Sequence, residues 1–296
     1  MDFPIAGVHL DPLVLVFLGF SIGVMGGFFG VGGSFIAGPA LFNLGIPMNY
    51  VVGTDLAHIA GKSVVAAKKH RALGNVDVKL GLIMTVGTVL GVEIGVQLIQ
   101  YLKSIGSVDR VVGTVFFCVL VCISTGVFLE SLRSLKSGIE EDRATSYPLV
   151  RWVQGLRLGP SVSLPTSGIV RISVMTIVLV ALVGGFFSGF LGGGAGYIRL
   201  PMMIFLLGVP THVAVGTDLF EIVVSASYGT FSHASHGNVD IMIALVMQTG
   251  AAVGANLGAG LTQFFSGPRI RLAFVPLPLI GAALILYKLL KGGAGH

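Results

Sequence analysis

Residues 26–34 read Gly26-Gly27-Phe28-Phe29-Gly30-Val31-Gly32-Gly33-Ser34, and they end the first long apolar run, which begins at Leu13. A helix needs roughly 20 apolar residues to cross the hydrocarbon core of a bilayer, and this run has about that length. Glycine lets the backbone turn sharply and lets another group approach it closely. The stretch therefore predicts a membrane helix that breaks and then continues as a short second helix.

Composition supports a membrane protein over the whole chain. The 296 residues are 54% hydrophobic and 10% charged, with a mean hydropathy of +0.93. Soluble domains carry roughly 25% charged residues, so this chain could not cover itself in water. We expect an all-α integral membrane protein, multi-pass in the inner (plasma) membrane of the cell. The net charge of +5 does not indicate a nucleic-acid partner, because nearly all Lys and Arg lie in loops or at helix ends, where the positive-inside rule expects them.

The glycine-rich break occurs twice because the chain is an internal duplication. Several separate motifs of the first half return in the same order in the second: Gly26-Gly27-Phe28-Phe29 as Gly184-Gly185-Phe186-Phe187, Val52-Gly53-Thr54-Asp55-Leu56 as Val215-Gly216-Thr217-Asp218-Leu219, and Gly74-Asn75-Val76-Asp77 as Gly237-Asn238-Val239-Asp240. Repeats of this kind predict that both halves fold in the same way.

The duplication predicts two homologous membrane repeats, residues 1–130 and 171–296, joined by a cytoplasmic linker, residues 131–170. Each repeat should contain four spanning helices and one short broken or re-entrant helix, which gives eight to ten membrane segments. The short pieces, 35–46 and 197–209, would be only about 18 to 20 Å long as helices. Counting basic residues does not decide whether the second copy is inverted or parallel.

Short, glycine-interrupted helices at matching places in two halves indicate a transporter's binding site. Unpaired N–H groups at a helix N-terminus favour an anion. We expect substrate contacts from Gly32, Gly33 and Ser34 in the first break and from Gly193 and Gly194 in the second. Close helix packing is the alternative interpretation of these glycines.

Ionisable residues follow each break at helical spacing. Asp55, His58 and Lys62 fall on one helix face, and the copy places Asp218, Glu221 and Ser225 there. Such residues are costly inside a membrane and indicate a pathway or a partner. We expect Lys62 to attract the anion and Asp55, His58, Asp218 and Glu221 to exchange a proton. The alternatives are structural pairing of Asp55 with Lys62 through His58, or a Lys62 that reaches the membrane surface.

Three further residues complete the expected substrate site. Thr54 and Thr217 precede the acidic residues of the two copies, and Arg199 lies just before Pro201 in the second short piece. Arg199 either binds substrate or anchors the helix at the membrane interface.

The remaining sequence patterns indicate helix packing, and none of them predicts a metal site or a catalytic site. Gly87, Gly91 and Gly95 repeat every four residues, which predicts a helix face for close packing. No Cys and His spacing predicts a metal site, and no nucleophile has a base partner. We therefore expect no enzyme activity, no cofactor and no metal.

The glycine-rich stretch 26–33, Pro39, Gly53-Thr54, the motif at 74–77 and their copies together resemble the TauE/SafE family of sulfite and organosulfonate exporters. The resemblance covers nearly the whole chain outside the linker. It implies a secondary transporter that exports sulfite, sulfoacetate or a related sulfonate by alternating access, with protons as the coupling partner. An anion channel, or a permease for another small organic anion, is the alternative. The oligomeric state stays open, with a homo-oligomer among the alternatives.

Overall fold

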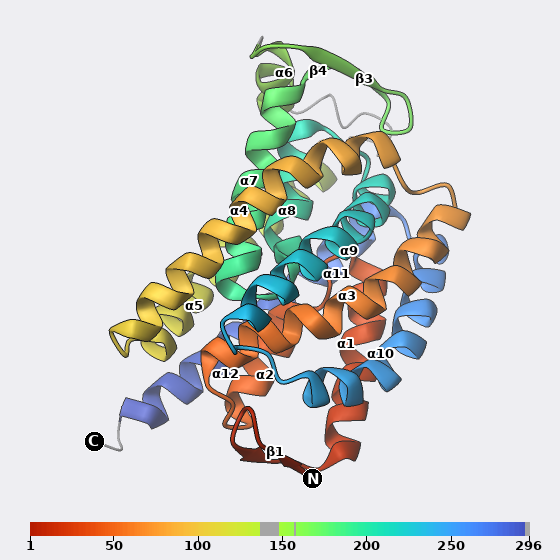
Figure 1. Cartoon of the computed structure of the whole chain (residues 1–296). Coiled ribbons are helices and arrows are strands. Elements are labelled where there is room, and N and C mark those ends of the chain that lie inside the picture. The colour runs from red at the N-terminus through yellow and green to blue at the C-terminus, as the bar shows by residue number, and fades with distance from the viewer. Residues whose placement is uncertain (137–147, 157, 294–296) are drawn as a thin grey trace.

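The structure, a computed structural model, describes residues 1–136, 148–156 and 158–293 (Figure 1). The first half contains α1 (Pro12–Phe29), α2 (Ser34–Asn43), α3 (Met48–Ala72), α4 (Val78–Ser104) and α5 (Val108–Lys136). The second contains α7 (Val174–Leu191), α8 (Gly196–Met202), α9 (Thr211–Ser235), α10 (Ile241–Leu261), α11 (Gly267–Phe274) and α12 (Pro276–Gly293). Three further elements lie outside these sets: the short helix α6 (Pro148–Gly155), the hairpin β1–β2 (Asp2–Phe3, Val8–His9) and the hairpin β3–β4 (Ser161–Leu164, Ile169–Ser173).

Six helical stretches in the described residues are long and apolar enough to cross a membrane: Pro12–Phe29, Val78–Ser104, Val108–Leu132, Val174–Leu191, Ile241–Phe264 and Gly267–Lys291. The chain is thus a helical, multi-pass membrane protein, as its composition predicts. The helices α3 and α9 are equally long, with 25 residues each, but they carry the ionisable residues. They pack against each other within the bundle.

The glycine repeats bring helices of the two halves into close contact. Three glycines of α4, four residues apart, each face a main-chain carbonyl of α7. A β-carbon at Gly87, Gly91 or Gly95 would overlap the carbonyl oxygen of Val178, Leu182 or Phe186, respectively. The same relation holds between α1 and α10 through Gly250, Gly254 and Gly258. The prediction that these glycines serve helix packing is confirmed.

The loop at 74–77 is held by the other half of the chain. The backbone N–H of Asp77 donates to Thr217 Oγ1 of α9 at 2.8 Å. Its carboxylate accepts from the N–H of Leu80, which caps α4, and from Ser167 Oγ of the β3–β4 hairpin at 2.6 Å. We refer to Asp77, Thr217 and Ser167 as the Asp77 clasp.

The equivalent loop at 237–240 makes the matching contacts. Asp240 N–H donates to Thr54 Oγ1 of α3 at 2.9 Å, and Asp240 Oδ2 accepts from the N–H of Ala6 in the β1–β2 hairpin at 3.1 Å. Asp240, Thr54 and Ala6 form the Asp240 clasp. Each clasp joins the loop that follows one of the helices α3 and α9 to the first turns of the other. The two helices therefore run antiparallel.

The clasps lie at opposite ends of the bundle. Figure 1 shows the β1–β2 hairpin and the N-terminus at the bottom and the β3–β4 hairpin at the top. Because each hairpin touches one copy of the Gly-Asn-Val-Asp motif, the two copies face opposite sides of the molecule.

The structure differs from the sequence expectation in local details. The last spanning segment is divided into α11 and α12 by a break just before Pro276, because proline lacks the N–H that a continuous helix needs. The second short helix continues as a π-helical turn, Met203–Leu207. Two hairpins appear where the sequence shows no strand pattern, and α5 extends to Lys136, beyond the boundary expected at 130.

Candidate functional site

The two glycine-rich breaks meet in the centre of the bundle. Residues 30–35 and 189–200 are all buried. A β-carbon at Gly193 would overlap Ser34 Oγ, and one at Gly32 would lie 3.1 Å from the carbonyl oxygen of Gly193. The structure thus places Gly32 and Ser34 of the first half directly against Gly193 of the second half.

Glycine is required here by backbone conformation as well as by space. Gly33 and Gly193 have φ of 82° and 74°, in the left-handed region that L side chains rarely adopt. Gly194 lies in the same region and faces Ile222 of α9. These turns let α2 and α8 begin deep in the protein.

The first polar group lies on α3. Asp55, His58 and Lys62 are at most 2% exposed, and they lie on one helix face as the spacing predicts. His58 Nδ1 lies 3.4 Å from Asp55 Oδ1. Lys62 Nζ is buried, and none of the residues that the structure describes forms a hydrogen bond with it, so Lys62 does not reach the membrane surface.

The second polar group joins α8 to α9. Arg199 Nε donates to Asp218 Oδ1, and the same guanidinium forms an ion pair with Glu221 Oε2. All three side chains are 0% exposed. Arg199 therefore does not anchor a helix at the membrane interface, which was one of its two expected roles.

The N-terminus of α8 lies beside a carboxylate. A β-carbon at Gly196, the first residue of α8, would lie 2.5 Å from Asp218 Oδ2. Asp218 Oδ2 accepts no hydrogen bond from the described residues, so anion binding at this helix end stays a prediction.

The hydroxyls of Thr54 and Thr217 each accept a hydrogen bond from a backbone N–H in the two clasps. Their role as substrate ligands stays a prediction. Among the described residues, no group of three or more His, Cys, Asp or Glu could hold a metal ion.

Tyr197 of α8 belongs to the centre although the sequence gave no reason to select it. It is 0% exposed, and its hydroxyl has no hydrogen-bond partner within the described part of the chain. An aromatic residue in an apolar segment is no signal by itself, so only its burial in the folded protein distinguishes Tyr197.

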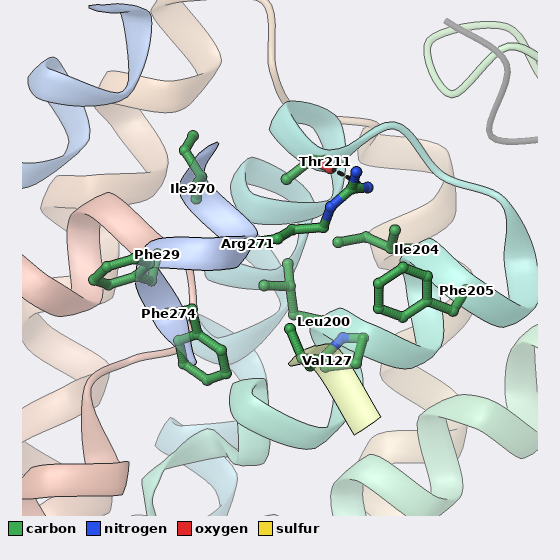
Figure 2. Close-up of a pocket in the computed structure, with 10 residues that line it drawn as sticks. Phe29, Val127, Leu200, Ile204, Phe205, Thr211, Ile270, Arg271 and Phe274 are labelled. Atoms are coloured by element: carbon green, nitrogen blue, oxygen red, sulfur yellow. Dashed lines mark hydrogen bonds between the residues drawn. The ribbon is translucent and has the colours of Figure 1, made fainter. Parts of the chain in front are cut away.

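A small apolar pocket lies beside this centre but contains none of the predicted site residues (Figure 2). Arg271 of α11 lines it and donates from Nη1 to Thr211 Oγ1 at 3.2 Å, while its guanidinium lies over the Phe205 ring. The cavity of about 10 Å³ could hold no more than one water. It is too small for a sulfonate.

Comparison with known proteins identifies relatives along almost the full chain. The model of the family described as "Sulfite exporter TauE/SafE" matches residues 15–285. The chain is 28% identical over 282 residues to the probable membrane transporter protein YunE of Bacillus subtilis, covering 92% of this chain and 97% of the relative. It is 29% identical over 290 residues to a probable membrane transporter protein of Xylella fastidiosa, covering 94% and 93%. No solved structure gives a significant match.

Proposed function

Because the chain belongs to the TauE/SafE sulfite exporter family, whose members are membrane transporters and not enzymes, we propose that it is a proton-coupled secondary transporter that exports a small sulfur-containing anion. Sulfite, sulfoacetate and related sulfonates are the proposed substrates.

The observation that carries this proposal is the buried ammonium of Lys62. A charged group is rarely buried without a partner, because desolvation is costly. Lys62 Nζ has no hydrogen-bond partner among the described residues, and Asp55 lies two helical turns away on the same helix. An anion that reaches the centre would find this cation available, whereas Arg199 is already paired with two carboxylates.

The group formed by Arg199, Asp218 and Glu221 supports the proton coupling. Two carboxylates share one guanidinium, so the buried group carries one more acid than base. An uncompensated buried negative charge is unfavourable, and a proton shared by the two acids would neutralise it. We assign the coupling proton to this pair.

We further propose that the two halves are inverted repeats that rock around the central site. The placement of the two Asp clasps at opposite ends supports this arrangement, as do the antiparallel α3 and α9. Each break with its polar helix would then face one side of the membrane, which suits alternating access. The burial of both breaks favours a gated carrier over an open channel.

Transport in liposomes tests the function directly. The purified protein should move labelled sulfite or sulfoacetate into or out of vesicles, with saturation, and a pH gradient should drive net movement uphill. Flux that neither saturates nor responds to the gradient would identify a channel. Failure to move any small anion would refute the proposal.

A Lys62→Met variant tests the site. It keeps an unbranched side chain but removes the charge, so the half-saturation concentration for sulfite should rise at least roughly tenfold, the value of one hydrogen bond to a charged group. Lys68→Met, at an exposed position of the same helix, is the matched control. Equal half-saturation concentrations in the two variants would remove Lys62 from the site.

A further inference from the structure

A surface cavity lies at the end of the bundle opposite the Asp77 clasp, where the loop between α4 and α5 meets the start of α3 and the end of α12. Its volume is about 810 Å³, within the roughly 300 to 1,000 Å³ that is typical of ligand pockets. Lys103 of its lining donates from Nζ to Asn238 Oδ1 at 2.7 Å, which places the cavity beside the loop of the Asp240 clasp. The cavity is therefore separate from the central site.

Three basic side chains line this cavity: Lys103, Arg110 and Lys288. In the described part of the chain, none of the three forms an ion pair. The lining also contains Asp109, but its Oδ1 already accepts a hydrogen bond from the N–H of Met48, where α3 begins, at 2.8 Å. The cavity therefore carries a net positive charge, which attracts anions.

A neighbouring cavity extends this basic surface. It shares Lys288 and adds Lys291, whose ammonium lies 4.6 Å from the centre of the Tyr287 ring. The positive-inside rule does not account for these basic residues, because it predicts that the opposite end is cytoplasmic, where the segment 68–79 carries four Lys and Arg residues. Their position at this end needs another explanation.

The cavity lies at the start of the helix that carries the central cation. Asn49 lines the cavity, and Lys62 lies about 20 Å further along α3 at 1.5 Å per residue. An anion that leaves Lys62 loses the attraction of that ammonium. Further cations on its way out would lower the free-energy cost of leaving, because a cleft lined by one sign of charge concentrates counter-ions.

We propose that this cavity is the vestibule through which the exported oxyanion leaves the protein, and that Arg110 and Lys288 attract the anion there. This inference rests on the proposed function and adds a second anion site to it. The cavity is much larger than one sulfite or sulfonate group, so the anion keeps its hydration water and is held mainly by charge. Such attraction weakens as the salt concentration increases.

A single cysteine in the cavity measures its charge. Thr114 is exposed and lines the cavity, so Thr114→Cys is made in a chain whose native Cys118 and Cys122 are replaced by serine. The rate of its reaction with a methanethiosulfonate that carries a sulfonate group is divided by the rate with one that carries a trimethylammonium group. We refer to Arg110→Gln and Lys288→Gln in one chain as the paired variant.

The paired variant should lower this rate ratio roughly tenfold at low ionic strength, because the two reagents respond to the lost charges in opposite directions. At about 1 M salt, where charges are screened within about 3 Å, the difference should largely disappear. In liposomes at low ionic strength, the paired variant should move sulfoacetate at least roughly threefold more slowly than the wild type.

Two controls isolate the cavity. Lys68→Gln with Arg71→Gln removes the same charge from exposed positions at the opposite end, and should change neither the rate ratio nor transport. Ile5→Cys lies in the β1–β2 hairpin, at the same end but outside the cavity lining, and is exposed. Its rate ratio should scarcely change in the paired variant.

Sulfoacetate is the anion probe for the vestibule. In detergent without added lipid, it should slow the reaction of Thr114→Cys with the sulfonate reagent, and the paired variant should abolish this protection. An unchanged rate ratio, absent protection or wild-type transport by the paired variant would overturn the inference and leave the proposed function standing. Protection by phosphatidylglycerol but not by sulfoacetate would assign the cavity to lipid headgroups and overturn the inference as well. A wild-type protein that moves no anion would overturn both.

Discussion

At the scale of single residues, the two buried cations of the centre differ in their partners. Arg199 forms ion pairs with two carboxylates of α9, whereas Lys62 has no hydrogen-bond partner in the described ranges. Breaking a buried ion pair by removing one side leaves the other charge uncompensated, which costs far more than the pair contributes. Arg199 should therefore support the fold, and Lys62 should support binding.

An Arg199→Met variant should lower the free energy of unfolding by about 3 to 5 kcal/mol, because Asp218 and Glu221 would remain buried without their counter-charge. Thermal unfolding of the purified protein in detergent measures the change. Neutralising both acids in the same chain should restore much of the lost stability. Arg171→Met, at an exposed position in β4, should have little effect.

A wild-type melting temperature for Arg199→Met, combined with lost sulfite transport, would instead identify Arg199 as a substrate ligand. The sequence alone could not separate these roles. It places Arg199 near Pro201, but its partners Asp218 and Glu221 lie on another helix, and the pairing depends on how α8 packs against α9.

At the scale of elements, the clasps fix the polar helices to the loops of the opposite half. Thr217 and Thr54 each satisfy a buried backbone N–H that has no helical partner at the start of α4 or α10. Thr217→Val removes the acceptor without changing the size of the side chain, and should cost about 1 to 3 kcal/mol of stability. The drop in melting temperature measures it.

Thr249→Val provides the comparison for Thr217→Val. The hydroxyl of Thr249 bonds only to the carbonyl of Val246 in its own helix, and the residue is exposed. Its loss should scarcely change the melting temperature. Equal melting temperatures for the two variants would show that the Asp77 clasp does not hold the fold.

Sequence analysis could predict the elements better than the contacts between them. The breaks and the polar faces follow from glycine spacing and helical period, which act locally. The clasp contacts of Ser167 and Ala6 come from hairpins whose strands have two to five residues, too short for a reliable alternating pattern. Tyr197 shows no local signal either, because its burial depends on side chains from distant positions, such as Phe116 of α5.

At the scale of the whole molecule, the proposed inverted arrangement of the two halves makes a prediction about sidedness. Arg71 and Ala234 occupy the same position before the two Gly-Asn-Val-Asp motifs, and both are exposed. Single cysteines there should react with a membrane-impermeant thiol reagent from opposite sides of the membrane. The native Cys118 and Cys122, which are also exposed, are first replaced by serine.

Right-side-out and inside-out vesicles distinguish the outcomes of this labelling. Arg71→Cys should react only in inside-out vesicles, because the segment 68–79 carries four Lys and Arg residues, which the positive-inside rule places on the cytoplasmic side. Ala234→Cys should react only in right-side-out vesicles. Labelling of both from the same side would contradict inverted repeats.

The pairing of α1 with α10 also constrains how the protein is made. The glycine face of α1 has its partner in residues that the ribosome adds only near the end of synthesis. During translation, the glycine face of α1 therefore stays unpaired in the lipid until α10 is made. The glycine face of α4 likewise stays unpaired until α7 is made. A nascent chain stopped after α5 lacks α7, α9 and α10, so maturation in the membrane should begin only once the second half has emerged.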